Sequence, residues 1–280
     1  MNAVRVLRRR MPTTDDQRLV IMRLPEGVKR LTNPVVGRVP VPIMSGPNRG
    51  LWWSLASAGS GYMSGRRAAR QMHLVASLIA RGDVVWDVGA HHGFVSLCAA
   101  PRVGPEGEVH AFEPSHKNQW FIARHLGWND IDNVTVHPYA LSSYNGTSCL
   151  GGPGTSKTLT LGQGTDVVDV RTGRGVIDSG AARSPSFAKL DVEGAEAEVL
   201  LGMIESLRRD AIILIAVHSR EAYAGCLTLL EKNGYAILPS RALQASLDGT
   251  WRSDPDMLCV GPEHATGVLT QRLLRHFGFD

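Results

Sequence analysis

The sequence predicts an α/β protein with a doubly wound, mostly parallel sheet, an antiparallel last strand and an N-terminal extension. Three observations support this fold class. Apolar runs of strand length alternate with helical segments from residue 84 onward. The first run leads into the glycine-rich turn of Val84–Gly93, which is typical of a buried strand that passes through a tight loop into a helix. Acids (Asp87, Glu113 and Asp191) stand where three predicted strands end.

The individual elements follow from hydrophobic periodicity and from breaks at glycine and proline. We expect strands at Val84–Asp87, Glu108–Phe112, Val134–Leu141, Phe187–Leu190, Ala211–Val217, Tyr235–Leu238 and Met257–Val260. The last two are expected to close one edge of the sheet in antiparallel orientation. Helices are expected at Arg67–Ile79, Phe94–Ala100, from an N-cap at Ser115 to about Leu126, Ala195–Leu207 and Tyr223–Asn233. Pro101–Gly107 is expected to be a loop.

Two regions lack a sustained period. In the first, we expect one short strand at Leu19–Leu24 and an edge strand within Val35–Met44, where two prolines exclude a central strand. The second, Ser142–Gly175, is rich in Gly, Thr and Ser and is expected to contain short strands at Thr158–Leu161 and Val167–Val170. We therefore divide the chain into an N-terminal extension or lid region (1–80), a main domain (81–265) and a C-terminal tail (266–280).

Charge and cysteine content narrow the environment of the protein. The formal charge is +4, and the basic residues concentrate in the first 30 positions, which we expect to form a solvated arm. The four cysteines lie far apart without a CxxC pair, which favours reduced thiols and a cytoplasmic location. No apolar run reaches transmembrane length and the first residues lack a signal-peptide pattern, so no membrane insertion is expected.

The turn after the first strand indicates the kind of ligand. Its pattern, Asp87-x-Gly89-x-x-x-Gly93, differs from the G-x-G-x-x-G loop that receives a pyrophosphate. The carboxylate of Asp87 would repel a pyrophosphate, but it would attract an ammonium or sulfonium group. S-adenosylmethionine carries both of these cations, together with a carboxylate that backbone N–H groups can bind.

Glu113 supplies the second indication of a cofactor. It ends the strand that follows Asp87, and an acid in that place can accept hydrogen bonds from both ribose hydroxyls. Ligands of open parallel sheets bind beyond the carboxyl ends of the strands, where Asp87, Glu113 and Asp191 are all expected. The sequence therefore predicts a nucleoside cofactor at this edge of the sheet.

Several segments resemble the FkbM family of S-adenosylmethionine-dependent methyltransferases. The matching stretches are Asp87-Val-Gly-Ala-His-His-Gly93, Ala111-Phe-Glu-Pro114, Ala140-Leu-Ser142, Gly61-Tyr62-x-x-Gly65 and, most specifically, Lys189-Leu-Asp-Val-Glu-Gly-Ala-Glu-Ala-Glu-Val-Leu-Leu-Gly202. The resemblance covers about residues 46–262. One departure is visible, since the family usually has Asn at the place of His91 and a small apolar residue at that of His92.

The resemblance implies a class I methyltransferase fold with a seven-stranded sheet. It also implies O-methyl transfer to a hydroxyl of a sugar, glycolipid or natural product. The cofactor-binding residues expected on these grounds are Tyr62, Asp87, Gly89, Ala90, His91, Gly93, Phe94, Glu113, Pro114, Ala140, Leu141, Ser142 and Asp191.

Candidate catalytic residues follow from the needs of methyl transfer, which requires an aligned acceptor oxygen and usually removal of its proton. Asp191 is the first candidate, either to orient a ligand or to act as base. Glu193 either shares that task or interacts with the dipole of the next helix. Lys189 either pairs with these acids or extends toward solvent. His218, at the end of a buried strand, is the best-placed histidine for a general base, although such a histidine can be merely hydrogen-bonded.

Other residues are given structural roles. Glu196 and Glu198 are expected to be charges on an exposed helix face. Trp52, Trp53 and Trp128 are expected to pack in the core or on the surface rather than against a substrate. We expect no metal site, because the acids and histidines form no close i, i+4 pair.

Three functions stay open. The first is an O-methyltransferase whose partner is a small-molecule or glycan hydroxyl acceptor. The second is an RNA methyltransferase, which the basic N-terminal residues suggest, but no RNA-binding motif accompanies them and nucleic acid is not the expected partner. The third is a non-catalytic S-adenosylmethionine-binding partner of a biosynthetic complex. The proline-rich segment Val35–Pro47 is the candidate for pairing with a second copy in a homodimer.

Overall fold

The structure is a computed structural model that describes residues 39–57, 60–64, 69–151, 160–162, 164–240, 243, 247 and 256–264. The strand expected at Leu19–Leu24, the basic first 30 residues and the tail 266–280 lie outside the described residues. The described part of the chain is enough to test the predicted sheet and its helices.

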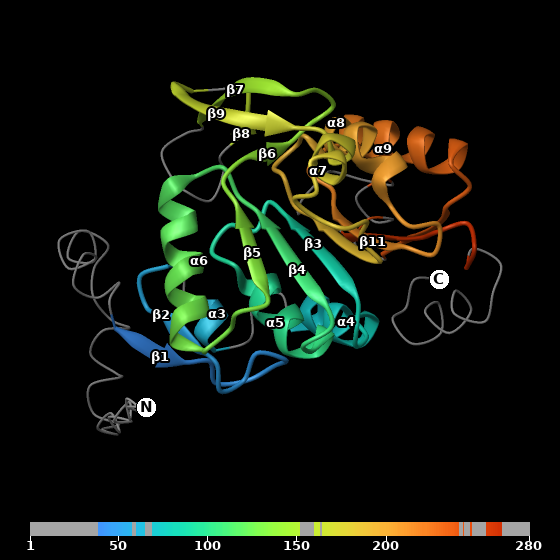
Figure 1. Ribbon diagram of the computed structural model, residues 1–280. Coiled ribbons are helices and arrows are strands. Elements are labelled where there is room, and N and C mark those ends of the chain that lie inside the picture. The colour runs from blue at the N-terminus through green and yellow to red at the C-terminus, as the bar shows by residue number, and fades with distance from the viewer. Residues whose placement is uncertain are drawn as a thin grey trace, which may run out of the picture.

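A seven-stranded sheet forms the centre of the molecule, in the order β12-β13-β11-β10-β3-β4-β5 (Figure 1). Its strands are β3 (Val84–Val88), β4 (Glu108–Phe112), β5 (Val134–His137), β10 (Phe187–Leu190), β11 (Ile212–Ala216), β12 (Ala236–Pro239) and β13 (Asp256–Val260). The strands from β11 to β5 pair in parallel, and β13 runs antiparallel to both of its neighbours. This confirms the doubly wound sheet with an antiparallel last strand. The last strand lies between β11 and β12, so the edge itself is β12.

Helices cover both faces of this sheet because both faces are apolar. Three of them, α4 (Ala69–Leu78), α5 (Phe94–Val103) and α6 (His116–Trp128), share a core with the sheet face that carries Val85 and Leu214. The opposite face packs against α7 (Gly173–Asp178), α8 (Glu196–Met203) and α9 (Arg220–Lys232). A short 3-10 helix at Ile204–Ser206 extends α8.

A second, smaller sheet was only partly predicted. It consists of β6 (Ala140–Leu141), β7 (Gly146–Gly151), β8 (Thr160–Leu161) and β9 (Asp166–Arg171), and it lies at the top of Figure 1. The prediction of one strand over Val134–Leu141 was wrong, because the chain leaves the central sheet at His137 and enters the small sheet at Ala140. Pro138 between them has no N–H to continue a ladder. Helix α7, capped by Thr172, was also missed.

Two helix boundaries differ from the predicted ones. Helix α5 continues through Pro101 to Val103, whereas Pro101–Gly107 was expected to be a loop. The proline lies in the last turn, where its missing N–H removes one helical hydrogen bond shortly before the helix ends. Helix α9 begins at Arg220 rather than Tyr223, because the Ser219 hydroxyl accepts a hydrogen bond from the N–H of Ala222.

The described part of the N-terminal extension packs on the main domain. Strands β1 (Pro40–Pro42) and β2 (Trp52–Ser54) form an antiparallel pair, followed by helix α3 (Ser60–Met63). The indole of Trp53 is fully buried, with its ring centroid 3.8 Å from that of His125 on α6. It also meets the ring of Phe94 edge-on. The expectation that Trp53 packs in the core is confirmed.

Two observations bear on the environment of the protein. All four cysteines are free, and three of them are buried while Cys149 is exposed. None of the helices in the described part of the chain combines the length and the apolar character that crossing a membrane requires.

Candidate active site

The site lies where the strand order reverses. From β3 the chain builds β4 and β5 on one side, and it later returns to place β10 and β11 on the other side. The loops that follow β3 and β10 therefore diverge beyond Val88 and Leu190, which are paired in the sheet. Such a reversal is where open α/β sheets bind their ligands.

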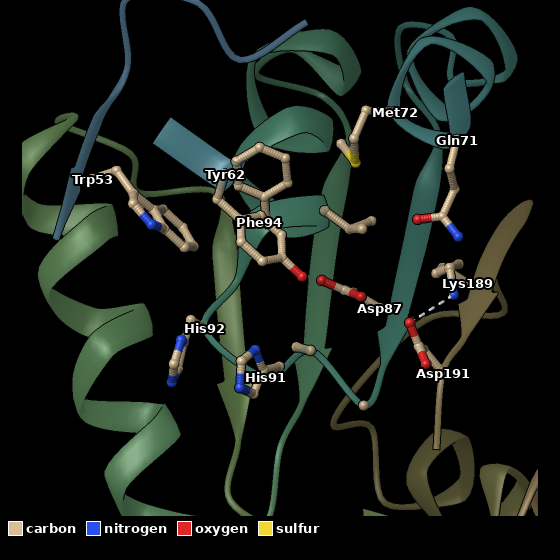
Figure 2. Close-up of a pocket in the computed structure, with 13 residues that line it drawn as sticks. Trp53, Tyr62, Gln71, Met72, Asp87, His91, His92, Phe94, Lys189 and Asp191 are labelled. Atoms are coloured by element: carbon tan, nitrogen blue, oxygen red, sulfur yellow. Dashed lines mark ion pairs between the residues drawn. The ribbon is translucent and has the colours of Figure 1, made fainter. Parts of the chain in front are cut away.

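A pocket opens at this place and holds about 490 Å³ of space, part of it open to solvent (Figure 2). Seven of the expected cofactor residues line it: Tyr62, Asp87, Gly89, Ala90, His91, Phe94 and Asp191. The remaining lining residues are Trp53, Gln71, Met72, His92, Val95 and Lys189.

Asp87 is the acid at the centre of the pocket. Its Oδ2 atom accepts hydrogen bonds from the backbone N–H of Ser96 at 2.9 Å and from the Ser96 hydroxyl at 2.5 Å. Burial nevertheless raises the pKa of the Asp87 carboxyl from 3.8 to about 6. A buried carboxylate that faces a pocket is suited to bind a cationic group, because a nearby cation favours its ionised form.

The loop after β3 needs a glycine at its first turn. A Cβ atom on Gly89 would lie 2.0 Å from the backbone oxygen of Asp191, and Gly89 adopts a φ of +78°. Gly89 therefore allows the loops after β3 and β10 to touch. Gly93, with a φ of +80°, stands at the start of α5 and does not line the pocket.

His91 also adopts a left-handed conformation, with a φ of 52°. Asn, Asp and His tolerate this region better than other residues with a Cβ, which accounts for His at a place where the family usually has Asn. The ring of His92 stacks on that of His91, with centroids 3.7 Å apart. Burial, followed by the electrostatic influence of His91, His125 and Lys117, lowers the pKa of His92 to about 2, so this ring is neutral at physiological pH.

Glu113 was expected to bind ribose, but its carboxylate makes contacts inside the protein. Its Oε2 atom accepts the N–H of His91 and its Oε1 atom accepts the N–H of Ser115, both at 2.8 Å. Burial raises the pKa of this carboxyl to about 7. Through the contact with the N–H of His91, Glu113 holds the loop after β3. Neither Glu113 nor Pro114 lines the pocket, so the ribose contact of Glu113 stays a prediction.

Ala140, Leu141 and Ser142 are buried in and beside β6 of the smaller sheet. The Ser142 hydroxyl donates a hydrogen bond to Glu198 at 2.8 Å. Glu198 thus joins α8 to the smaller sheet and is more than a charge on a helix face. The three residues do not line the pocket, and their cofactor contacts also stay predictions.

Lys189 and Asp191 form an ion pair at the pocket wall (Figure 2). The Lys189 side chain is 1% exposed, and its Nζ atom lies 3.2 Å from Oδ2 of Asp191. Burial alone would lower the pKa of Lys189, but the carboxylates of Asp191, Asp256 and Asp87 outweigh it and raise the pKa. Lys189 therefore pairs with Asp191 and does not extend toward solvent.

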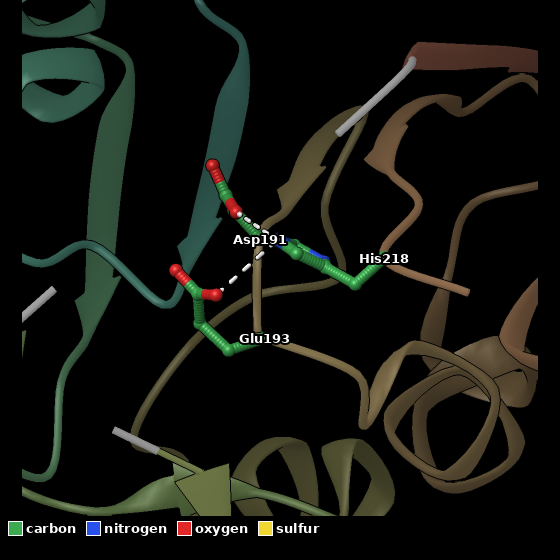
Figure 3. Close-up of side chains that lie close together, drawn as sticks. All are labelled: Asp191, Glu193 and His218. Atoms are coloured by element: carbon green, nitrogen blue, oxygen red, sulfur yellow. Dashed lines mark ion pairs between the residues drawn. The ribbon is translucent and has the colours of Figure 1, made fainter. Parts of the chain in front are cut away.

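His218 lies among three carboxylates beyond this pair. Figure 3 shows two of them, those of Asp191 and Glu193. Its Nε2 atom is 3.6 Å from Oδ1 of Asp191 and 3.5 Å from Oε2 of Glu193. Its Nδ1 atom is 2.7 Å from Oε1 of Glu196. Burial opposes a charge on the ring, but Glu196 first, then Asp191 and Glu193, raise the pKa of His218 to about 9. A protonated His218 cannot accept a proton, so the carboxylates are the better bases at neutral pH.

Glu196 was expected on an exposed helix face, and this was wrong. Its side chain is fully buried, and Oε1 also accepts the N–H of Gly194 at 2.8 Å. The spacing held a usable signal, because Glu196 precedes the buried Val199, Leu200 and Met203 by three, four and seven positions. By contrast, nothing in the spacing of Trp53 or Gln71 predicts that these two residues join Tyr62 in lining the pocket.

The sheet order, the acid-bearing loop at its reversal point and the pocket define a Rossmann-like protein of the class that binds nucleoside cofactors. Residues 87–237 match the Methyltransferase FkbM domain. The chain therefore belongs to the FkbM methyltransferase family, which confirms the family predicted from the sequence. The matched domain is a methyltransferase domain with the class I fold, and the cofactor of this family is S-adenosylmethionine.

One curated relative is the hexuronic acid methyltransferase AglP of Haloferax volcanii, which is 32% identical over 145 residues. The alignment covers 49% of this chain and 56% of that protein, so the chain matches little more than half the length of its relative.

Two solved structures are more distant. A putative rRNA-methylase from Clostridium thermocellum is 13% identical with a TM-score of 0.48, over 69% of this chain and 93% of that one. A methyltransferase FkbM from Methylobacillus flagellatus KT is 16% identical with a TM-score of 0.45, over 71% and 53% of the two chains.

Proposed function

We propose that the protein transfers a methyl group from S-adenosylmethionine to a hydroxyl of a sugar or of a sugar-containing small molecule. The observation that carries this proposal is the position of Asp191. It lines the pocket together with Asp87, and it also belongs to the charged cluster with Lys189 and His218. A carboxylate beside a cofactor pocket is what an acceptor hydroxyl needs for orientation and for loss of its proton.

The pocket residues divide into a cofactor side and an acceptor side. Asp87, with its raised pKa, attracts the cationic part of the cofactor, and Tyr62 and Phe94 supply apolar walls. When bound, the cofactor supplies the methyl group on a sulfonium. On the acceptor side, Asp191 or Glu193 takes the proton of the hydroxyl, while Lys189 holds Asp191 in place.

The sugar acceptor is supported by the relative from Haloferax volcanii, which is a hexuronic acid methyltransferase. The alignment covers about half of each chain, so the acceptor class is a proposal for this protein. A glycolipid or another natural product with a free hydroxyl satisfies the same chemistry.

The test uses two measurements on the full chain. Isothermal titration measures binding of S-adenosylmethionine and S-adenosylhomocysteine. Methyl transfer is then followed as S-adenosylhomocysteine release with a panel of hexoses, uronic acids, their glycosides and a short RNA. Transfer to a sugar hydroxyl that fails in Asp191→Asn, with cofactor binding kept, supports the proposal. Methylation of the RNA alone, or cofactor binding without transfer to any acceptor, contradicts it.

A further inference from the structure

Three atoms that can bind a metal converge beside the pocket. Asp191, Glu193 and His218 each offer one such atom, and these atoms lie within 4.8 Å of one another (Figure 3). We propose that these three side chains bind one divalent metal cation. From the sequence we expected no metal site. Two of the residues follow β10 and the third follows β11, so their proximity appears only in the folded sheet.

The distances fit ligands of one ion better than direct hydrogen bonds. Nε2 of His218 lies 3.6 Å from Asp191 and 3.5 Å from Glu193, beyond the usual range of about 2.7–3.2 Å for an N–H···O hydrogen bond. Two atoms that each lie about 2.1 Å from one cation are separated by about 3 Å at a right angle and about 3.6 Å at 120°. The two separations from Nε2 of His218 fall in this interval.

The second, independent observation is the buried carboxylate behind the imidazole. Glu196 is fully buried, and its Oε1 atom lies 2.7 Å from Nδ1 of His218. A metal-binding histidine usually donates its other ring N–H to such a carboxylate, which fixes the tautomer and the ring orientation. With the proton on Nδ1, the lone pair of Nε2 points toward two carboxylate oxygens, and a metal cation can take the place that a second ring proton would otherwise occupy.

Charge supports a divalent ion. Asp191, Glu193 and Glu196 carry three negative charges, and Lys189 is the ammonium in direct contact with the group. With a neutral His218, the formal charges of Asp191, Glu193, Glu196 and Lys189 sum to −2, which one divalent ion would balance. Oε2 of Glu196 is buried and has no hydrogen-bond partner among the described residues, which adds to the negative potential. Lys189 contacts Oδ2 of Asp191, so Oδ1 can still bind a metal.

The donor set indicates which ion to use. Two carboxylates and one imidazole suit Mn²⁺ and other first-row divalent ions, while Mg²⁺ prefers oxygen ligands alone. Three protein ligands leave coordination positions for water or for an acceptor oxygen. A role in holding the acceptor rests on the proposed function, whereas binding of the ion does not.

The decisive experiment is a Mn²⁺ titration of the full chain after treatment with EDTA and dialysis. Electron paramagnetic resonance follows the free Mn²⁺ signal, and we expect one saturable site per chain. Asp191→Asn, Glu193→Gln and His218→Ala should each weaken Mn²⁺ binding at least tenfold. Glu196→Gln should weaken it about 10–100-fold, the range for residues that orient a metal-binding histidine.

The matched controls are His73→Ala and Glu205→Gln, which replace an exposed histidine and an exposed glutamate. Both should bind Mn²⁺ as the unaltered protein does. Circular dichroism and S-adenosylhomocysteine binding identify any variant that fails to fold, and Glu193→Gln, on a half-buried residue, provides a mild substitution.

Saturable Mn²⁺ binding that His218→Ala and Glu193→Gln leave unchanged would overturn the proposal, as would the absence of binding by the unaltered protein. If the unaltered protein binds no Mn²⁺, a proton on His218 supplies the positive charge between the carboxylates. Methyl transfer that persists in EDTA, without Mn²⁺ binding, rejects the metal site and keeps the proposed function. Binding of Mn²⁺ through His218 without methylation of any hydroxyl keeps the metal site and rejects the proposed function.

Discussion

At the scale of single residues, Asp87 connects the chemistry of the pocket with the stability of the protein. Its folded-state pKa of about 6 exceeds the ordinary 3.8, so the folded protein holds this proton more tightly than the unfolded chain. The resulting stabilisation is complete below pH 3.8 and is lost as the pH rises through 6. The shift corresponds to about 3 kcal/mol for a fully buried group.

We therefore predict that Asp87→Asn makes the cofactor-free protein more stable at pH 7.5 by about 1–3 kcal/mol, because it removes a buried charge. The gain should shrink at pH 5. The same variant should bind S-adenosylmethionine at least tenfold more weakly, because an amide attracts the cation less. Urea unfolding at the two pH values and isothermal titration measure both effects. A variant that is less stable and binds the cofactor normally would show that Asp87 is only a structural acid.

His91 is the second residue with a specific expectation, because its φ is 52°. His91→Asn should keep the free energy of unfolding within about 0.5 kcal/mol, since Asn tolerates this conformation. His91→Val should lose about 1–2 kcal/mol, because a branched Cβ is strained there. Titration of His91→Asn with S-adenosylmethionine across a pH series tests the predicted cofactor contact. Identical binding at every pH would count against that contact.

At the scale of elements, the contact between α8 and β6 depends on a glycine at the end of the FkbM signature. A Cβ atom on Gly202 would lie 1.9 Å from the backbone oxygen of Ser142. We predict that Gly202→Ala lowers the free energy of unfolding by more than about 2 kcal/mol, because backbone must move to admit the methyl group. Thermal and urea unfolding provide the measurement.

The control for this prediction is Gly127→Ala in α6, where a Cβ atom would meet nothing within 4 Å. Here the higher helix propensity of alanine should leave stability unchanged or raise it by up to about 1 kcal/mol. Equal losses at the two positions would mean that helix propensity, and not the approach of α8 to β6, controls the result.

At the scale of the whole molecule, the described part of the N-terminal extension belongs to the same folded unit as the main domain. Trp53 is fully buried against His125 and Phe94, and it lines the pocket. We predict that Trp53→Ala lowers the free energy of unfolding by about 3–5 kcal/mol and weakens cofactor binding. Trp120→Ala, at a position that is 42% exposed, should lose less than about 1 kcal/mol. A separate unfolding transition for the extension would contradict this view.

The sequence predicted the central sheet well because its strands are short apolar runs bounded by glycine, proline or acids. It predicted Asp87, Gly89 and Asp191 at one edge because parallel strands end together. It did not predict contacts that depend on side-chain direction. The Glu113 carboxylate accepts hydrogen bonds from the N–H groups of His91 and Ser115. The Glu196 carboxylate contacts the ring of His218. The pocket wall formed by Trp53 and Gln71 depends on long-range packing, for which local periodicity holds no signal.

The pairing of β3 with β10 has a consequence for how the protein is made. Val84 at the start of β3 and Ser186 just before β10 are hydrogen-bonded although 102 positions separate them along the chain. During translation β3 leaves the ribosome well before β10 is synthesised. Until then, the edge of β3 that pairs with β10 has no partner strand. Cofactor binding therefore comes late in biogenesis, and chains that terminate between the two strands should aggregate through that edge.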